Sequence, residues 1–111
     1  MNEKLVLIGF CFQEVPKLKK IAEDEGLRVK VLYQASEVIP TLKKHNTKYL
    51  VGLCCPDQTP FMEKILDREG FVYKSVVVHG NGVCVKKGGV RGKISMKEYR
   101  EALKWLKKIK S

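Results

Sequence analysis

Apolar positions divide the first 79 residues into two alternating kinds of segment. One kind is a short, nearly continuous apolar run, which is typical of a strand buried on both faces. The other kind repeats its apolar residues three and four positions apart, which predicts an amphipathic helix. The predicted strands are 4–12, 27–33, 48–55 and 71–79, and the predicted helices are 14–26, 35–46 and 59–70.

Prolines and hydroxyl residues support these helix boundaries. Pro16 and Pro40 fall in the first turns of their helices and Pro60 at a first helical position, where the missing N–H group costs nothing. Ser36 and Thr59 are predicted N-caps, because a side-chain oxygen there can accept a hydrogen bond from the first turn. The buried stripe predicted for the helix 59–70 consists of Phe61, Met62, Ile65 and Leu66.

The pattern changes after residue 79. The stretch "HGNGV" (79–83) contains Asn-Gly, which favours a tight hairpin turn leading into a short antiparallel edge strand, "VCVKK" (83–87). A last amphipathic helix is predicted over 95–110, opened by a capping box of Ser95 and Glu98. Its predicted apolar face consists of Met96, Tyr99, Leu103, Leu106 and Ile109.

Strands and helices alternating at this spacing predict one α/β domain, residues 1–111, with three layers and a Rossmann-like or flavodoxin-like arrangement. The sheet should hold about four mostly parallel strands, extended by the C-terminal hairpin strand. A composition of 44% hydrophobic and 8% aromatic residues is typical of a globular protein. The chain has no apolar run near the ~20 residues that span a bilayer and begins without a basic leader or cleavage site, so we expect a cytoplasmic protein without a membrane partner.

Charge is distributed unevenly along the chain. Residues 1–85 carry 12 Lys and Arg against 10 Asp and Glu, whereas residues 86–111 carry 10 against 2, so the last quarter supplies most of the net charge of +10. The Lys- and Glu-rich composition is also thermophile-like, and intracellular disulfides are common in hyperthermophiles.

The candidate chemistry lies in four cysteines. Cys11, Cys54 and Cys55 lie at the ends of predicted strands, and Cys84 comes back across the predicted hairpin. Ligands of open α/β sheets bind where the carboxyl ends of the strands meet, so we expect these thiols to gather at that edge. In a reducing cytosol, cysteines are free thiols, metal ligands or reactive groups before they are disulfides. Thiolates select soft metals, so the sequence predicts a cysteine-lined site for zinc or an iron–sulfur centre, or a redox-active thiol pair.

Core filling is the alternative for each cysteine taken singly, because free cysteine is among the most buried residue types. The pair Cys54-Cys55 fits it less well. Neighbouring strand residues point to opposite faces and Pro56 ends the strand, so one thiol should face the ligand edge. His79, at the end of the fourth predicted strand, is a ligand, an acid–base group or a hydrogen-bonded structural residue. Without paired carboxylates, a Ser-His-Asp set or a dinucleotide fingerprint, the sequence assigns no catalytic residue.

A second candidate site is a weak anion site at Arg91, Lys93 and Ser95, in front of the last predicted helix. The stretch "GGVRGKIS" (88–95) does not have P-loop spacing, because Ile94 separates Lys93 from Ser95. A flexible basic loop is the alternative interpretation.

The last helix carries cations around its polar side: Lys97, Arg100, Lys104, Lys107, Lys108 and Lys110. Such a face is usually only solvated, but the segment 86–110 could also bind nucleic acid or an acidic partner through phosphate or carboxylate contacts. A third interpretation is a homo-oligomeric structural domain whose cysteines fill the core or form disulfides.

Two stretches, "IAEDEGLRVKVLYQASEVIPTLKKHNTKYLVGLCCPDQ" and "VYKSVVVHGNGVCV", resemble the C-terminal half of the uncharacterised cysteine-rich family called domain of unknown function 116. The likeness spans roughly residues 20–85. Its most specific points are Ser36 with Ile39, Pro40 and Leu42, the run Val51 to Cys54, and Cys84 after Gly82.

This chain departs from the family pattern in its N-terminal part, where Cys11 stands in place of a cysteine-rich segment. In addition, Val83 separates Cys84 from the turn glycine, and 86–94 looks like an insertion. The resemblance implies a cysteine site for a metal or an iron–sulfur centre at the strand ends. It favours Cys54 and Cys84 in particular as ligands.

Overall fold

The computed structural model describes residues 3–9, 14–53, 59–76, 78–79 and 93–109 of the 111-residue chain. The elements are β1 (Glu3–Gly9), α1 (Val15–Asp24), β2 (Arg28–Leu32), the 3-10 turn η1 (Ala35–Glu37), α2 (Val38–Lys44), β3 (Thr47–Leu53), α3 (Thr59–Arg68), β4 (Val72–Val76), β5 (Val78–His79), β6 (Lys93–Ile94) and α4 (Met96–Lys108).

Strands β1 to β4 form one sheet in the order β2-β1-β3-β4, and all of its pairs are parallel. β1 lies inside the sheet, where Leu5 pairs with Arg28 on one side and with Leu50 on the other. Leu50 pairs in turn with Tyr73 of β4. The predicted α/β class, with a mostly parallel sheet of about four strands, is confirmed.

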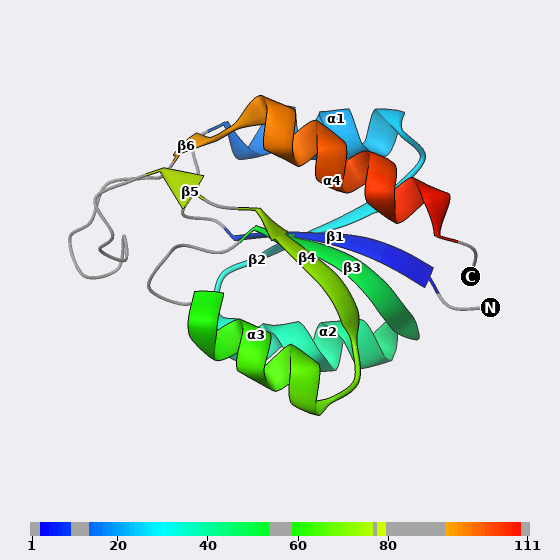
Figure 1. Cartoon of the computed structure of the whole chain (residues 1–111), viewed down its shortest axis with the longest axis vertical. Helices are drawn as coiled ribbons and strands as arrows, with labels where there is room; N and C mark the ends of the chain where they lie inside the picture. The colour runs from blue at the N-terminus through cyan, green and yellow to red at the C-terminus, as the bar shows by residue number, and fades with distance from the viewer. Residues whose placement is uncertain (1–2, 10–13, 54–58, 77, 80–92, 110–111) are drawn as a thin grey trace.

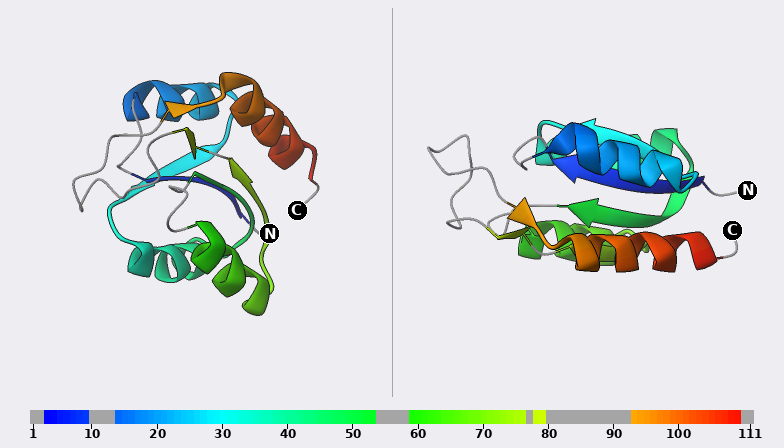
Figure 2. Two further views of the ribbon diagram at one scale, coloured as in Figure 1. Left: turned by 60° about the vertical axis from the view of Figure 1, so that its left-hand side comes forward. Right: turned by 90° about the horizontal axis from the view of Figure 1, so that it is seen from above.

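The sheet is the middle of three layers. Helices α1 and α4 cover one face, and α2 and α3 cover the other (Figure 1; Figure 2). Val6 and Ile8 of β1 pack in the cluster under α1 and α4, while Leu5 and Leu7 pack in the cluster over α2 and α3. All four side chains are buried, as the continuous apolar run of the first strand predicts.

Helix α4 packs on the same face as α1, although about two thirds of the sequence lies between them. Its apolar stripe of Tyr99, Leu103 and Leu106 is buried, as predicted. The Tyr99 hydroxyl donates a 2.7 Å hydrogen bond to the carbonyl oxygen of Leu18 in α1. Satisfying this hydroxyl lets a tyrosine occupy the core without an unpaired polar group.

The predicted N-cap at Ser36 is wrong. Ser36 lies within η1, and α2 begins only at Val38. The carboxylate of Glu37 instead accepts hydrogen bonds from the backbone N–H groups of Tyr33 and Gln34, both at 2.7 Å. A charged acceptor with a longer side chain reaches these two donors and organises the turn ahead of α2.

The buried stripe predicted for α3 is wrong at Phe61, which is 57% exposed. The face that α3 turns toward the sheet centres on Met62 and Leu66, both buried, and Ile65 is half-buried. A helix buries only the side chains near the centre of its inner face, and Phe61 lies off that centre.

The predicted fourth strand is divided into β4 and the short β5, which ends at His79. β5 pairs antiparallel with β6, apart from the main sheet. The hairpin strand predicted at 83–87 lies outside the described residues. Among the described helices, none is long and apolar enough to cross a membrane.

Candidate thiol site at the carboxyl edge of the sheet

The winding direction of the sheet reverses between β1 and β3. β2 lies on one side of β1, and β3 lies on the other. Ile8 pairs with Leu53, so the two strands end side by side, at Gly9 and Leu53. Strand ends at such a reversal point diverge into connections on opposite faces, which is why open α/β sheets bind ligands there.

The predicted metal ligands Cys11, Cys54, Cys55 and Cys84 all lie outside the described residues. Their sequence positions relate them to the described strand ends. Cys11 is the second residue after Gly9, and Cys54 directly follows Leu53. The structure therefore brings together the strand ends that lead into three of the four cysteines.

Two helices begin at this same edge, immediately after the segments that contain these cysteines. Neither α1 nor α3 has an acidic residue in its first turn. Glu14 stands at the N-cap of α1 but makes no side-chain hydrogen bond to the helix backbone. The first turns of both helices thus contain no carboxylate, and the partial positive charge of a helix N-terminus lowers the pKa of a nearby thiol.

The described ranges contain no cluster of three or more His, Cys, Asp or Glu side chains that could hold a metal ion. His79 is the last residue of β5 and lies five residues before Cys84 in the sequence.

The predicted anion site is described only in part. Lys93 is exposed in β6, Ser95 is the N-cap of α4, and Arg91 lies outside the described residues. The Ser95 hydroxyl accepts a 3.3 Å hydrogen bond from the backbone N–H of Glu98, so this half of the predicted capping box is confirmed. An external anion would compete there with Glu98 in the first turn of α4. The anion site remains a prediction.

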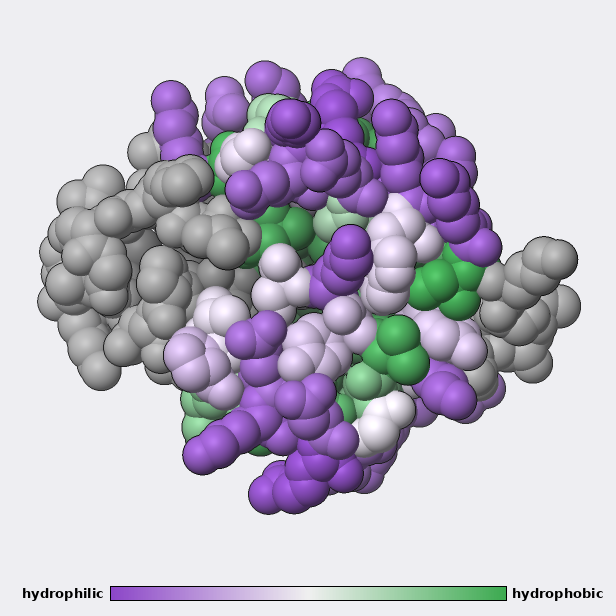
Figure 3. Space-filling view, viewed as in Figure 1, coloured by the Kyte–Doolittle hydropathy of each residue, from purple (hydrophilic) through white to green (hydrophobic). Residues whose placement is uncertain are grey.

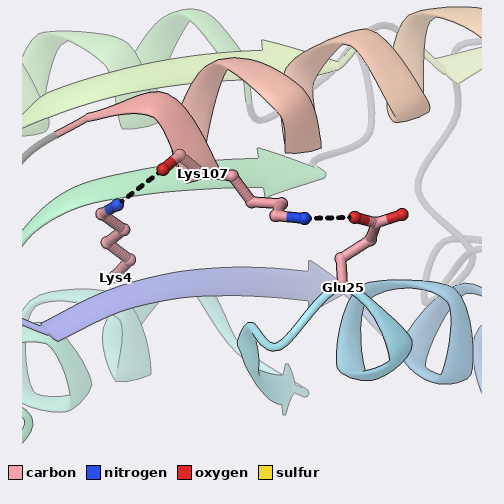
Figure 4. A network of polar contacts seen from close by, with 3 residues as sticks. All are labelled: Lys4, Glu25 and Lys107. Carbon is pink, nitrogen blue, oxygen red and sulfur yellow. Dashed lines mark hydrogen bonds and ion pairs between the residues drawn. The ribbon is translucent and has the colours of Figure 1, made fainter.

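A polar network at the opposite end of α4 involves Glu25, which the sequence analysis did not single out (Figure 4). Lys107 Nζ lies 2.8 Å from Glu25 Oε2, and Lys4 Nζ donates to the Lys107 carbonyl oxygen at 3.1 Å. The hydrogen bond and charge of Lys107 lower the pKa of Glu25, and the charges of Arg100 and Lys104 lower it further. Because 82 residues separate Glu25 from Lys107, no local pattern reveals this pair.

No protein-family model, curated protein or solved structure matches this chain. The resemblance to domain of unknown function 116 accordingly stays a prediction.

Proposed function

We propose that this protein binds a soft metal, as zinc or an iron–sulfur centre, through cysteine thiolates at the carboxyl edge of its sheet. Cys54 and Cys84 are the leading ligands, joined by Cys11, and Cys55 takes the place of Cys54 if it is the thiol that faces the site. The observation that carries the proposal is the pairing of β1 with β3, which end side by side at Gly9 and Leu53.

The geometry of neighbouring strands supports a shared site. Adjacent strands lie about 4.8 Å apart, and two residues of chain reach at most about 7 Å. Cys11 and Cys54 lie within two residues of paired strand ends. Sulfur ligands of one zinc ion, each bonded at about 2.3 Å, must lie close to one another. Neighbouring strand ends can bring two cysteines that close.

Electrostatics supports the same assignment. A thiol must lose its proton to bind a metal, so an environment that favours negative charge strengthens binding. The N-termini of α1 and α3, whose first turns contain no acidic residue, face this edge, and the chain carries a net charge of +10. Both features favour thiolates over neutral thiols.

A redox-active thiol pair is the second candidate at the same place. Disulfide formation requires Cα atoms about 4.4–6.8 Å apart, a separation that neighbouring strand ends also provide. Metal analysis and thiol counting separate the two functions, because a metal centre is lost with chelation and a disulfide with reduction.

The test begins with anaerobic purification, followed by measurement of zinc, iron and acid-labile sulfide per chain together with the visible absorption spectrum. We expect stoichiometric metal. The double variant Cys54→Ser/Cys84→Ser should lose it while retaining the far-ultraviolet circular dichroism of the wild type. A protein that stays metal-free after reconstitution with zinc or iron and sulfide would refute the proposal.

The adjacent cysteines provide a matched pair of single variants. If Cys54 and Cys55 continue the alternation of β3, only one of the two thiols can face the site. We therefore expect metal loss in only one of the variants Cys54→Ser and Cys55→Ser. Equal retention in both would exclude this pair from the site.

A further inference from the structure

The outer side of α4 carries a line of four cations. Lys97, Arg100, Lys104 and Lys107, here called the basic stripe, are all exposed. Their spacings of three and four residues place them on one side of the helix. Ten residues of helix extend about 15 Å, which equals the axial rise of roughly four DNA base pairs. Figure 3 shows hydrophilic side chains gathered over this helix.

The opposite side of α4 is fixed in the core. Tyr99, Leu103 and Leu106 are each at most 1% exposed. The half-buried Trp105 lies under Lys74, whose Nζ is 5.6 Å from the centre of the indole ring. The apolar face of α4 is packed in the core, so the helix cannot bind a membrane surface by inserting that face. A partner of the basic stripe must therefore be recognised by charge.

Glu25, at the C-terminal end of α1, opposes the basic stripe. Its carboxylate forms the 2.8 Å ion pair with Lys107, and the cations Arg100 and Lys104 also act on it. Both members of this ion pair are close to half exposed, at 46% and 42%, so an external anion can reach them. Carboxylate and phosphate oxygens bind the same ammonium group, so the negative charge of Glu25 opposes the approach of a phosphate to Lys107.

We propose that the basic stripe binds the phosphate backbone of nucleic acid and that Glu25 is an internal competitor for Lys107. Arg100 and Lys104 contact phosphates directly. Lys107 exchanges Glu25 for phosphate on binding, so the carboxylate reduces affinity and limits the number of phosphates neutralised. This surface is independent of the thiol site, and neither proposal depends on the other.

The first experiment measures fluorescence anisotropy of a labelled DNA duplex and, separately, of a labelled RNA strand as salt is raised from about 50 to 200 mM. The logarithm of the binding constant should fall linearly with the logarithm of salt, with a slope of about −3 to −4 for four duplex phosphates. The two probes decide which nucleic acid binds more tightly. No binding of either at about 50 mM salt would overturn the proposal, as would binding only to anionic lipid vesicles.

Charge-reversal variants test whether nucleic acid binds at the basic stripe. Arg100→Glu/Lys104→Glu should reduce the magnitude of the salt slope by about 2 and weaken binding more than tenfold at low salt. The matched control is Lys43→Glu/Lys44→Glu, which makes the same change in net charge at exposed positions of α2, on the other layer. Equal weakening by the control would show a general charge effect and contradict a site on α4.

Neutralising Glu25 tests the competitor. Glu25→Gln should strengthen binding about two- to fivefold, because removing the carboxylate leaves Lys107 available to a phosphate. The gain is small because exposed ion pairs of this kind contribute little and are readily exchanged. Glu69→Gln makes the same change in net charge at an exposed position after α3 and should leave affinity nearly unchanged. Identical effects of the two variants would refute the competitor role of Glu25. Circular dichroism and metal content, measured on every variant, verify that fold and thiol site are unaltered.

Discussion

The two helical layers are attached to the sheet in different ways. The layer of α1 and α4 contains hydrogen bonds between residues far apart in sequence, such as Tyr99 to Leu18 and Lys107 to Glu25. In the layer of α2 and α3, the polar contacts join residues closer in sequence: Glu37 holds the turn directly before α2, and Ser75 of β4 donates to the Glu63 carboxylate of α3. This difference shows that a helix returning from the C-terminal end needs specific anchors, whereas helices inside a βα repeat are positioned by their short connections.

The largest expected effect compares buried leucines of the two layers. Leu103→Ala in α4 should lower the free energy of unfolding by about 3–4 kcal/mol, and Leu42→Ala in α2 by about 2–3 kcal/mol. Both side chains are at most 1% exposed. We expect the larger loss at Leu103 because the anchored α4 cannot shift to fill the cavity, whereas the seven-residue α2 can. Urea denaturation measures both, and an equal or larger loss at Leu42 would contradict the comparison.

Removing the anchor of α4 should have a smaller effect. Tyr99→Phe deletes the hydroxyl bonded to Leu18 and should cost about 1 kcal/mol. Burial raises the pKa of Tyr99 above its ordinary value. Its contribution to stability is therefore fully present below the unfolded pKa of about 10 and is lost as pH rises toward the folded pKa. Denaturation at increasing alkaline pH should show a shallower decline for Tyr99→Phe than for the wild type.

An effect of opposite sign is expected at the start of β3. The Thr47 hydroxyl is buried and has no hydrogen-bond partner within the described part of the chain. Thr47→Val replaces it with a methyl group of similar size and should raise the free energy of unfolding by about 0.5–1 kcal/mol. A destabilised variant in the same denaturation assay would show that the hydroxyl is hydrogen-bonded after all.

The smallest effect concerns the exposed ion pair of Glu25 and Lys107. Lys107 holds the pKa of Glu25 below its ordinary value of 4.5. A lowered carboxyl pKa contributes stability above the unfolded pKa that is lost as pH falls through the folded pKa. We expect the thermal midpoint of Glu25→Gln to fall slightly less than that of the wild type between about pH 5 and 3. Parallel curves would mean that the pair does not stabilise the fold.

Local patterns predicted most of the fold. The apolar run of β1 predicted burial on both faces, and the stripe of Tyr99, Leu103 and Leu106 predicted the inner side of α4. The error at Ser36 arose from a competing local acceptor, whereas the error at Phe61 arose because tertiary position overrides local preference. At Ser36 a longer acceptor, Glu37, took over the turn, and at Phe61 the sheet met only part of the apolar face.

The candidate sites were predictable to different degrees. The positions of the cysteines in the sequence led to the prediction of a common edge, but only the strand order shows that β1 and β3 end as neighbours. Sequence periodicity contains no information on that order. The contact between Glu25 and Lys107 was likewise inaccessible, because it depends on α4 packing beside α1.

The measurement that tests the central claim most directly is the metal and sulfide content of the anaerobically purified protein, compared among the wild type, Cys54→Ser and Cys55→Ser. We predict stoichiometric zinc or iron in the wild type and its loss in only one of the two variants. A wild-type protein with four free thiols that binds neither zinc nor an iron–sulfur centre on reconstitution would contradict the account.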